Sequence, residues 1–161
     1  MCIHDNKVLA MKRFNNVIIL FIIILISSCE NDSNNENGIN FLKNSKWILL
    51  GFQPHDTHIL EFKPENLKEM GIEFNDSHWI HAISSCNWFD GYYSVAGHDI
   101  IQIDSLYSTM MNCENDTIRI WEDRYYNELK NAKNYQMAGD SLIITTKLST
   151  DIIFLAEYLT N

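Results

Sequence analysis

Short apolar and aromatic runs that alternate with turn-forming residues constrain this chain more than any other feature. The runs are rich in β-branched and aromatic side chains, and Gly, Asn, Asp and His separate them. They comprise residues 46–53, 59–62, 72–74, 79–87, 92–95, 99–104, 141–147 and 151–158. Segments of this length and spacing are typical of antiparallel sandwiches and barrels. Ala138-Gly139-Asp140, between Tyr135 and Leu142, further indicates a hairpin turn.

Residues 117–131 interrupt this rhythm with a helical pattern. The apolar positions that recur every three or four residues are Ile118, Trp121, Tyr125 and Leu129. This spacing places them on one face of a helix. Asp116 stands at the expected N-cap, and Lys130 near the end suits the helix dipole. We therefore expect a mainly β, small antiparallel barrel-like domain with one α-helix at about 117–131, which covers or plugs the β-core.

The start of the chain has the features of an export signal. Residues 17–26 form an unbroken apolar run, and Lys12 and Arg13 precede it. A basic segment followed by a short apolar run is the pattern of a secretory signal. The run is too short to span a bilayer, which takes roughly 20 apolar residues. We expect residues 1–28 to be a signal peptide, for which Met11 is a more typical start than Met1.

A cysteine directly follows this signal. Ile26-Ser27-Ser28-Cys29 resembles a bacterial lipobox, in which the cysteine thiol is lipidated and becomes the new N-terminus. An ordinary signal peptide followed by a chance cysteine is the alternative. The next residues are polar and cannot bury enough surface to offset the entropy of ordering. We expect a lipidated Cys29 and a flexible tether over residues 29–42, followed by one folded domain over residues 43–161.

The charge of the mature chain excludes one class of partner. Removing residues 1–28 takes away three of the 12 basic and one of the 21 acidic residues, so the formal charge becomes −11. Nucleic acid and bare anionic lipid repel such a chain. We expect no nucleic-acid binding, and membrane contact only through the lipid anchor.

Four sequence blocks occur in the order and spacing of one known family. They are Cys86-Asn87-Trp88-Phe89-Asp90-Gly91-Tyr92-Tyr93, Ser108-Thr109-Met110-Met111-Asn112-Cys113, Glu122-x-x-Tyr125-x-x-x-Leu129, and Tyr135 followed by Gly139-Asp140-Ser141-Leu142-x-Ile144. In these blocks the chain resembles the META domain (HslJ-like) proteins over roughly residues 45–158. The resemblance marks as family-motif residues Asn87, Phe89, Gly91, Tyr93, Thr109, Glu122, Gly139 and Asp140. It implies a barrel-like fold with one helix, attachment to the bacterial envelope and a link to stress responses, but no reaction.

Two cysteines, Cys86 and Cys113, remain in the expected domain. An exported chain meets an oxidising compartment in which disulfides persist. A bridge would close a loop of 27 residues, which is worth roughly 3 kcal/mol in the chain-entropy view. We expect a structural Cys86–Cys113 disulfide; two separate buried thiols are the alternative.

Motifs for catalysis or metal binding are weak in this sequence. His55-x-x-His58 and His78-x-x-His81 have a spacing that suits metal ligands on a helix. Both pairs lie in strand or loop sequence, where residues three apart point to opposite faces. The sequence contains neither a Gly-x-Ser-x-Gly nor a His-Glu-x-x-His motif. We therefore expect no metal, no cofactor and no catalytic residue.

An aromatic cluster, Trp88, Phe89, Tyr92 and Tyr93, is the remaining candidate for binding. Alternate residues of a strand face inward, so two of the four belong to the core. Trp88 and Tyr92 lie outside the family-motif positions, so we expect them to form an exposed partner surface.

These observations favour a monomeric, non-enzymatic lipoprotein of the bacterial cell envelope that binds or supports another envelope component. The alternative is a barrel that binds a small ligand, with the Trp88 region at its mouth. A third hypothesis is a purely structural module of the stress response. A convex face that carries Trp88 and Tyr92 would favour the first, and a concave apolar volume would favour the second.

Overall fold

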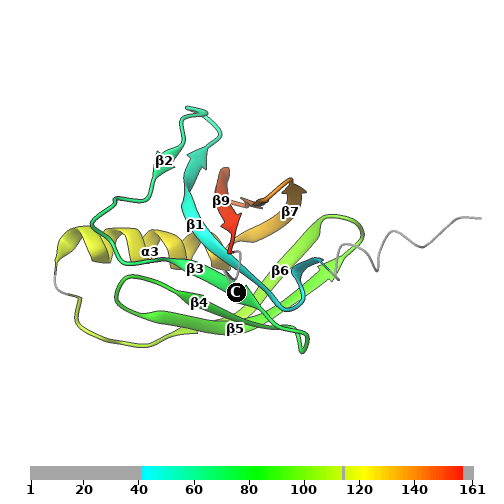
Figure 1. Cartoon of the computed structure of the whole chain (residues 1–161), viewed down its shortest axis with the longest axis horizontal. Coiled ribbons are helices and arrows are strands. Elements are labelled where there is room, and N and C mark those ends of the chain that lie inside the picture. The colour runs from blue at the N-terminus through cyan, green and yellow to red at the C-terminus, as the bar shows by residue number, and fades with distance from the viewer. Residues whose placement is uncertain (1–40, 114, 158–161) are drawn as a thin grey trace, which may run out of the picture. The chain divides into compact units, whose positions relative to one another are not determined.

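The computed structural model describes residues 41–113 and 115–157 (Figure 1). Its elements are β1 (Ser45–Pro54), β2 (Glu61–Phe62), β3 (Gly71–Phe74), β4 (Trp79–Ile83), β5 (Trp88–Ala96), β6 (Ile100–Ser108), α3 (Asp116–Lys130), β7 (Ala132–Ala138), β8 (Ser141–Thr146) and β9 (Thr150–Ala156). The expected signal peptide, Cys29 and nearly all of the expected tether lie outside the described residues. Leu42, at the end of that tether, is fully buried, so the packed domain includes it.

The strands form one antiparallel sheet that closes on itself. Its order is β2-β1-β3-β4-β5-β6-β7-β8-β9, and β1 also pairs with β9. Eight strands therefore form a closed barrel, and the two-residue β2 is added outside the ring on β1. The predicted mainly β, antiparallel barrel is confirmed.

The barrel is weakest where β6 meets β7, and helix α3 supports this place. The pairing of the two strands is limited to Ile100 with Asn134. The hydroxyl of Tyr126 on α3 donates to the backbone oxygen of Leu106 on β6 at 2.9 Å. Figure 1 shows α3 packed along one end of the strands. The helix thus covers the β-core, as predicted.

Alternating side chains fill the interior of the barrel. The largest of the fully buried ones are Tyr125, Phe52, Phe74, Phe89 and Phe154. The ring of Tyr125, contributed by α3, lies 5.8 to 6.5 Å from three of these phenylalanine rings. Its hydroxyl donates to the backbone oxygen of Gly71 at 2.8 Å. Burial raises the pKa of Tyr125 well above its ordinary value.

The helix begins one residue earlier than the sequence predicts. Its N-cap is Asn115, whose backbone is extended and whose side-chain oxygen accepts from the N–H of Ile118 at 3.0 Å. Asp116, the predicted N-cap, lies in the first turn, where its charge suits the helix dipole. The prediction failed because Asn and Asp are both good caps and stand side by side.

Three of the predicted strands, at 79–87, 92–95 and 99–104, differ from the observed bounds by four residues at one end, and the other bounds differ by at most two. The run 79–87 is not one strand: β4 ends at Ile83, and the N–H of Ser84 donates to the oxygen of Asn87 at 2.9 Å in a tight turn. Strand β5 starts directly after this turn and is longer than predicted. The sequence predicts the hairpin that follows Tyr135 but no strand with the bounds of β7, because Lys133, Asn134 and Gln136 interrupt its apolar residues. The hairpin between β7 and β8 is confirmed: Ala138 pairs with Ser141, and Gly139 has the positive φ that the turn requires.

Candidate functional site

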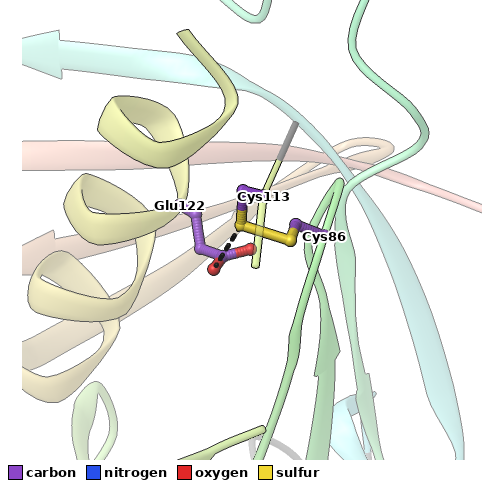
Figure 2. A group of neighbouring side chains, drawn as sticks. All are labelled: Cys86, Cys113 and Glu122. Atoms are coloured by element: carbon purple, nitrogen blue, oxygen red, sulfur yellow. Dashed lines mark hydrogen bonds between the residues drawn. A yellow bond between two sulfur atoms is a disulfide. The ribbon is translucent and has the colours of Figure 1, made fainter. Parts of the chain in front are cut away.

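A disulfide joins two loops that are far apart in the sequence. Cys86 lies in the turn between β4 and β5, and Cys113 lies between β6 and α3. Their Cα atoms are 5.7 Å apart. The structure therefore contains the expected Cys86–Cys113 bridge, with Glu122 of α3 directed at it (Figure 2).

Glu122 is a buried carboxylate whose charge the β4–β5 turn stabilises. It accepts hydrogen bonds from the N–H of Asn87 at 2.8 Å, from the amide side chain of Asn87 at 2.5 Å, and from the hydroxyl of Ser84. One oxygen also lies 3.6 Å from Cys113 Sγ, the contact drawn in Figure 2. A disulfide sulfur has no proton to donate, so this contact is not a hydrogen bond. Three donors satisfy the carboxylate, which a buried charge requires.

The other side of Asn87 holds the chain that follows β6. Its side-chain oxygen accepts from the hydroxyl of Thr109 at 2.8 Å and from the N–H of Met111 at 2.7 Å. The hydroxyl of Thr109 accepts in turn from the N–H of Trp88 at 3.2 Å. Asn87 thus connects the β4–β5 turn, the β6–α3 connection and the helix.

The family-motif residues fall into three groups. Asn87, Thr109 and Glu122 meet in the network beside the disulfide. Phe89 and Tyr93 are buried in the core, and a Cβ at Gly91 would lie 3.0 Å from a backbone oxygen of β6. Gly139 and Asp140 form the β7–β8 turn, away from the network. Ser84, whose hydroxyl also donates to Glu122, belongs to this network but is not one of the family-motif residues; a small polar residue two positions before a cysteine is its only signal in the sequence.

This network is suited to holding the fold rather than to chemistry. Each oxygen of Glu122 is occupied by donors, so the group is poorly placed to take a proton from a substrate. Cys86, Cys113 and Glu122 place possible metal-ligating atoms within 4.8 Å of one another. Soft metal ions bind thiolates, and the sulfurs here are joined in a disulfide.

The histidine pairs from the sequence do not converge. His55 Nε2 lies 3.0 Å from Asp151 Oδ1, and His81 Nδ1 lies 2.7 Å from Asp90 Oδ1. His78 stacks at 5.5 Å from the ring of Tyr93. In residues 41–113 and 115–157, His55, His78 and His81 each contact a different neighbour, and no metal-ligating group includes a histidine.

Large apolar side chains gather on the outer wall of β4, β5 and β6, which we call the aromatic face. Its members are Trp79, Ile83, Trp88, Tyr92 and Tyr107. The strand register pairs Trp79 with Tyr92 and Ile83 with Trp88. The ring of Trp79 lies edge-on to those of Tyr92 and Tyr107, with centroids 4.8 and 5.9 Å apart. The half-buried His81–Asp90 pair lies on the same face, between these residues.

A groove of about 210 Å³ borders the aromatic face. Gly71 is paired between Ile48 and Ile83, so the outer wall lacks a side chain there. A Cβ at Gly71 would come within 2.4 Å of the backbone oxygen of Trp47, so this position requires glycine. Ile83 and His81 belong to both the groove and the aromatic face. The charged residues that line the groove are Lys46, Glu69, Glu73 and Glu157.

Two further hollows flank the disulfide network. One of about 530 Å³ lies between residues 108–112 and α3, and is lined in part by Thr109, Glu122 and Tyr126. The other, of about 310 Å³, lies beside Cys86 and Asn115. The first is lined by Met110 and Met111, which are 98% and 50% exposed, and the second also by Met111.

In the described residues, the fold and the site together define a class: a small closed antiparallel barrel against which helix α3 packs. A buried Asn–Glu pair joins this helix to the β4–β5 turn, next to a disulfide between the two adjoining loops. The model of the META domain family matches residues 41–157. The chain belongs to the META domain family.

Solved structures share this fold at low sequence identity. A protein from Burkholderia xenovorans, determined by NMR, superimposes with a TM-score of 0.59 at 16% identity and covers 98% of this chain and 99% of its own. A DUF4847 family protein from Bacteroides vulgatus superimposes with a TM-score of 0.54 at 15% identity, over 72% of this chain and 94% of its own. A comparison with curated proteins finds no match. Among the described residues, no helix has the length and apolarity to cross a membrane.

Proposed function

We propose that this protein is a non-enzymatic, lipid-anchored lipoprotein of the bacterial cell envelope, and that its META domain binds another envelope component through the aromatic face. The observation that carries the proposal is the exposure of large apolar side chains on one wall. Tyr92 and Tyr107 are each 52% exposed, Ile83 is 50% exposed and Trp88 is 43% exposed. Contiguous exposed apolar patches mark interaction sites, and Trp and Tyr are enriched at their centres.

The packed interior supports a partner on the outside rather than a small ligand inside. Phe52, Phe74, Phe89 and Phe154 are all at most 1% exposed and meet around Tyr125. An eight-stranded barrel is just wide enough for side chains to fill it, so these buried rings favour a filled interior over a lipocalin-like ligand cavity. Trp88, the first residue of β5, is exposed, so its side chain faces away from the packed interior.

The family and the site both support a role without catalysis. The META domain is not known as an enzymatic family, and the saturated hydrogen bonds of Glu122 favour a structural role. Family and fold are those of an envelope-associated domain. The stress-related role remains part of this proposal and rests on the family alone.

Affinity capture of the lipidated protein from solubilised envelope tests this function. We expect a near-stoichiometric partner with the wild type and its loss, by at least about tenfold, in Trp88→Ala and Tyr92→Ala, because hot-spot aromatics dominate such interfaces. Phe62→Ala is the matched control, because Phe62 is an exposed aromatic residue outside the aromatic face. Equal recovery of the same proteins by all three variants would contradict the proposal.

A further inference from the structure

The groove beside the aromatic face has the shape of a site for one long side chain. Its volume of about 210 Å³ is roughly seven times the ~30 Å³ that one water occupies in the liquid. Ile48 and Ile83 form aliphatic walls on either side of the backbone of Gly71. A single extended side chain fits such a space, whereas a second protein element would not.

The charges at the rim of the groove select a cation. Lys46 Nζ lies 3.1 Å from Glu73 Oε2, and this hydrogen bond raises the pKa of Lys46. Within residues 41–113 and 115–157, Glu69 and Glu157 form no ion pair. The groove therefore combines apolar walls with three carboxylates and one cation. That cation, Lys46, is hydrogen-bonded to Glu73 and acts on Glu157 only at longer range, so the rim carries excess negative charge.

We infer that the groove receives a lysine or arginine side chain from a basic segment of the partner protein, an inference that rests on the proposed function of the aromatic face. Lysine and arginine side chains have an aliphatic stem, which fits the apolar walls of the groove, and a cationic head, which fits its acidic rim. Ile83 and His81 line both surfaces, so a segment that crosses the aromatic face reaches the groove without a gap. The net negative charge of the chain, −9 over the full sequence, also favours encounter with a basic segment.

The test measures the binding of a labelled basic peptide to the full-length protein by fluorescence anisotropy. The probe alternates lysine with leucine, and its control replaces lysine with glutamate. We expect the basic probe alone to bind, and its Kd to rise roughly fivefold in Glu69→Gln/Glu157→Gln, in line with two partly exposed ion pairs. The matched control, Asp56→Asn/Asp123→Asn, makes the same change in net charge at exposed positions outside the groove and is expected to leave the Kd within twofold.

Equal weakening in both double variants would show general electrostatic attraction and overturn the inference. No binding of the basic probe would overturn it as well. Spermidine that binds more tightly than the peptide, with the same dependence on Glu69 and Glu157, would assign the groove to small polyamines instead.

Envelope capture separates this inference from the proposed function. A partner lost in Trp88→Ala but fully kept in Glu69→Gln/Glu157→Gln would leave the aromatic face as the binding site and refute the groove. A partner kept in both would refute the proposed function itself. Loss in both is the expected result.

Discussion

At the scale of single residues, the buried polar groups explain why the family motif has its composition. Asn87 is 5% exposed and Glu122 is 8% exposed, and each would be costly to bury alone. Together they satisfy each other, because an amide offers two donors and an acceptor while a carboxylate only accepts. Asn87 can therefore bond to Glu122 on one side and to Thr109 and Met111 on the other.

Replacing Glu122 by glutamine is expected to lower the free energy of unfolding by about 2 kcal/mol, because hydrogen bonds to a charged group are lost and an amide N–H₂ meets other donors. Urea denaturation at pH 7 measures this change. Asp123→Asn is the control: its side chain is exposed, so a change of no more than about 0.5 kcal/mol is expected. Equal stability of Glu122→Gln and wild type would mean that the network does not support the fold.

Tyr125 gives the protein a stability that depends on pH. Burial raises its pKa in the folded state, so the unfolded chain loses the phenolic proton first, near its ordinary pKa of 10. Above that pH the folded state binds more protons than the unfolded state, and stability falls as pH rises. Below it this contribution is complete and constant.

We expect urea unfolding to show a loss of stability between pH 8 and pH 10.5 that is smaller in Tyr125→Phe. At pH 8 this variant is expected to be less stable by about 1 kcal/mol, because the hydrogen bond to the oxygen of Gly71 is missing. Burial also raises the pKa of Tyr93 and Tyr135, so the slope is expected to shrink rather than vanish. An identical slope in the variant would exclude Tyr125 as its source.

At the scale of elements, the disulfide and the Asn87 network act on the same two loops. The β4–β5 turn and the β6–α3 connection are joined once by Cys86–Cys113 and again by Asn87 with Met111. The turn explains why 79–87 is not one continuous strand: the N–H of Ser84 donates to the oxygen of Asn87, and the N–H of Asn87 donates to Glu122 instead of to a neighbouring strand.

Removing the disulfide with Cys86→Ser/Cys113→Ser is expected to cost about 3 kcal/mol, since the unfolded chain regains the entropy of a loop that spans 27 residues. Thermal unfolding of the oxidised, reduced and double-serine proteins measures it. The reduced and double-serine forms should agree closely. A double-serine variant as stable as the oxidised protein would show that the network alone holds the two loops.

At the scale of the whole molecule, the barrel separates a packed interior from an outer wall that carries the aromatic face. The ring of strands closes by the pairing of β1 with β9, so its edges do not offer a site for strand addition along that seam. What the domain can present to a partner is its outer wall, where the aromatic face and the groove meet at Ile83.

The anchor predicted from the sequence is tested on the whole molecule. Cys29→Ser is expected to move the protein from the membrane fraction to the soluble fraction, because the thioether to the lipid needs the cysteine sulfur. Its unfolding curve should match that of wild type, since Cys29 precedes the packed domain. Fractionation followed by immunoblotting gives the readout, and retention in the membrane fraction would contradict lipidation at this residue.

The sequence by itself determined the class of this protein. Period-two runs with turn residues between them indicate an antiparallel barrel, one period-3.6 segment indicates α3, and two cysteines in the domain have only each other to pair with. The strand and helix patterns depend only on residues that are close in the sequence, and two cysteines allow only one pairing. These inferences therefore need no coordinates.

Only the tertiary structure decided where polar and apolar groups meet. Glu122 and Asn87 are 35 residues apart, and the helix periodicity gave no reason to bury a carboxylate. The groove depends on the register that pairs Gly71 with Ile48 on one side and Ile83 on the other. Pairings between distant strands depend on how the whole barrel closes, and a shift of one residue would turn each side chain to the opposite face.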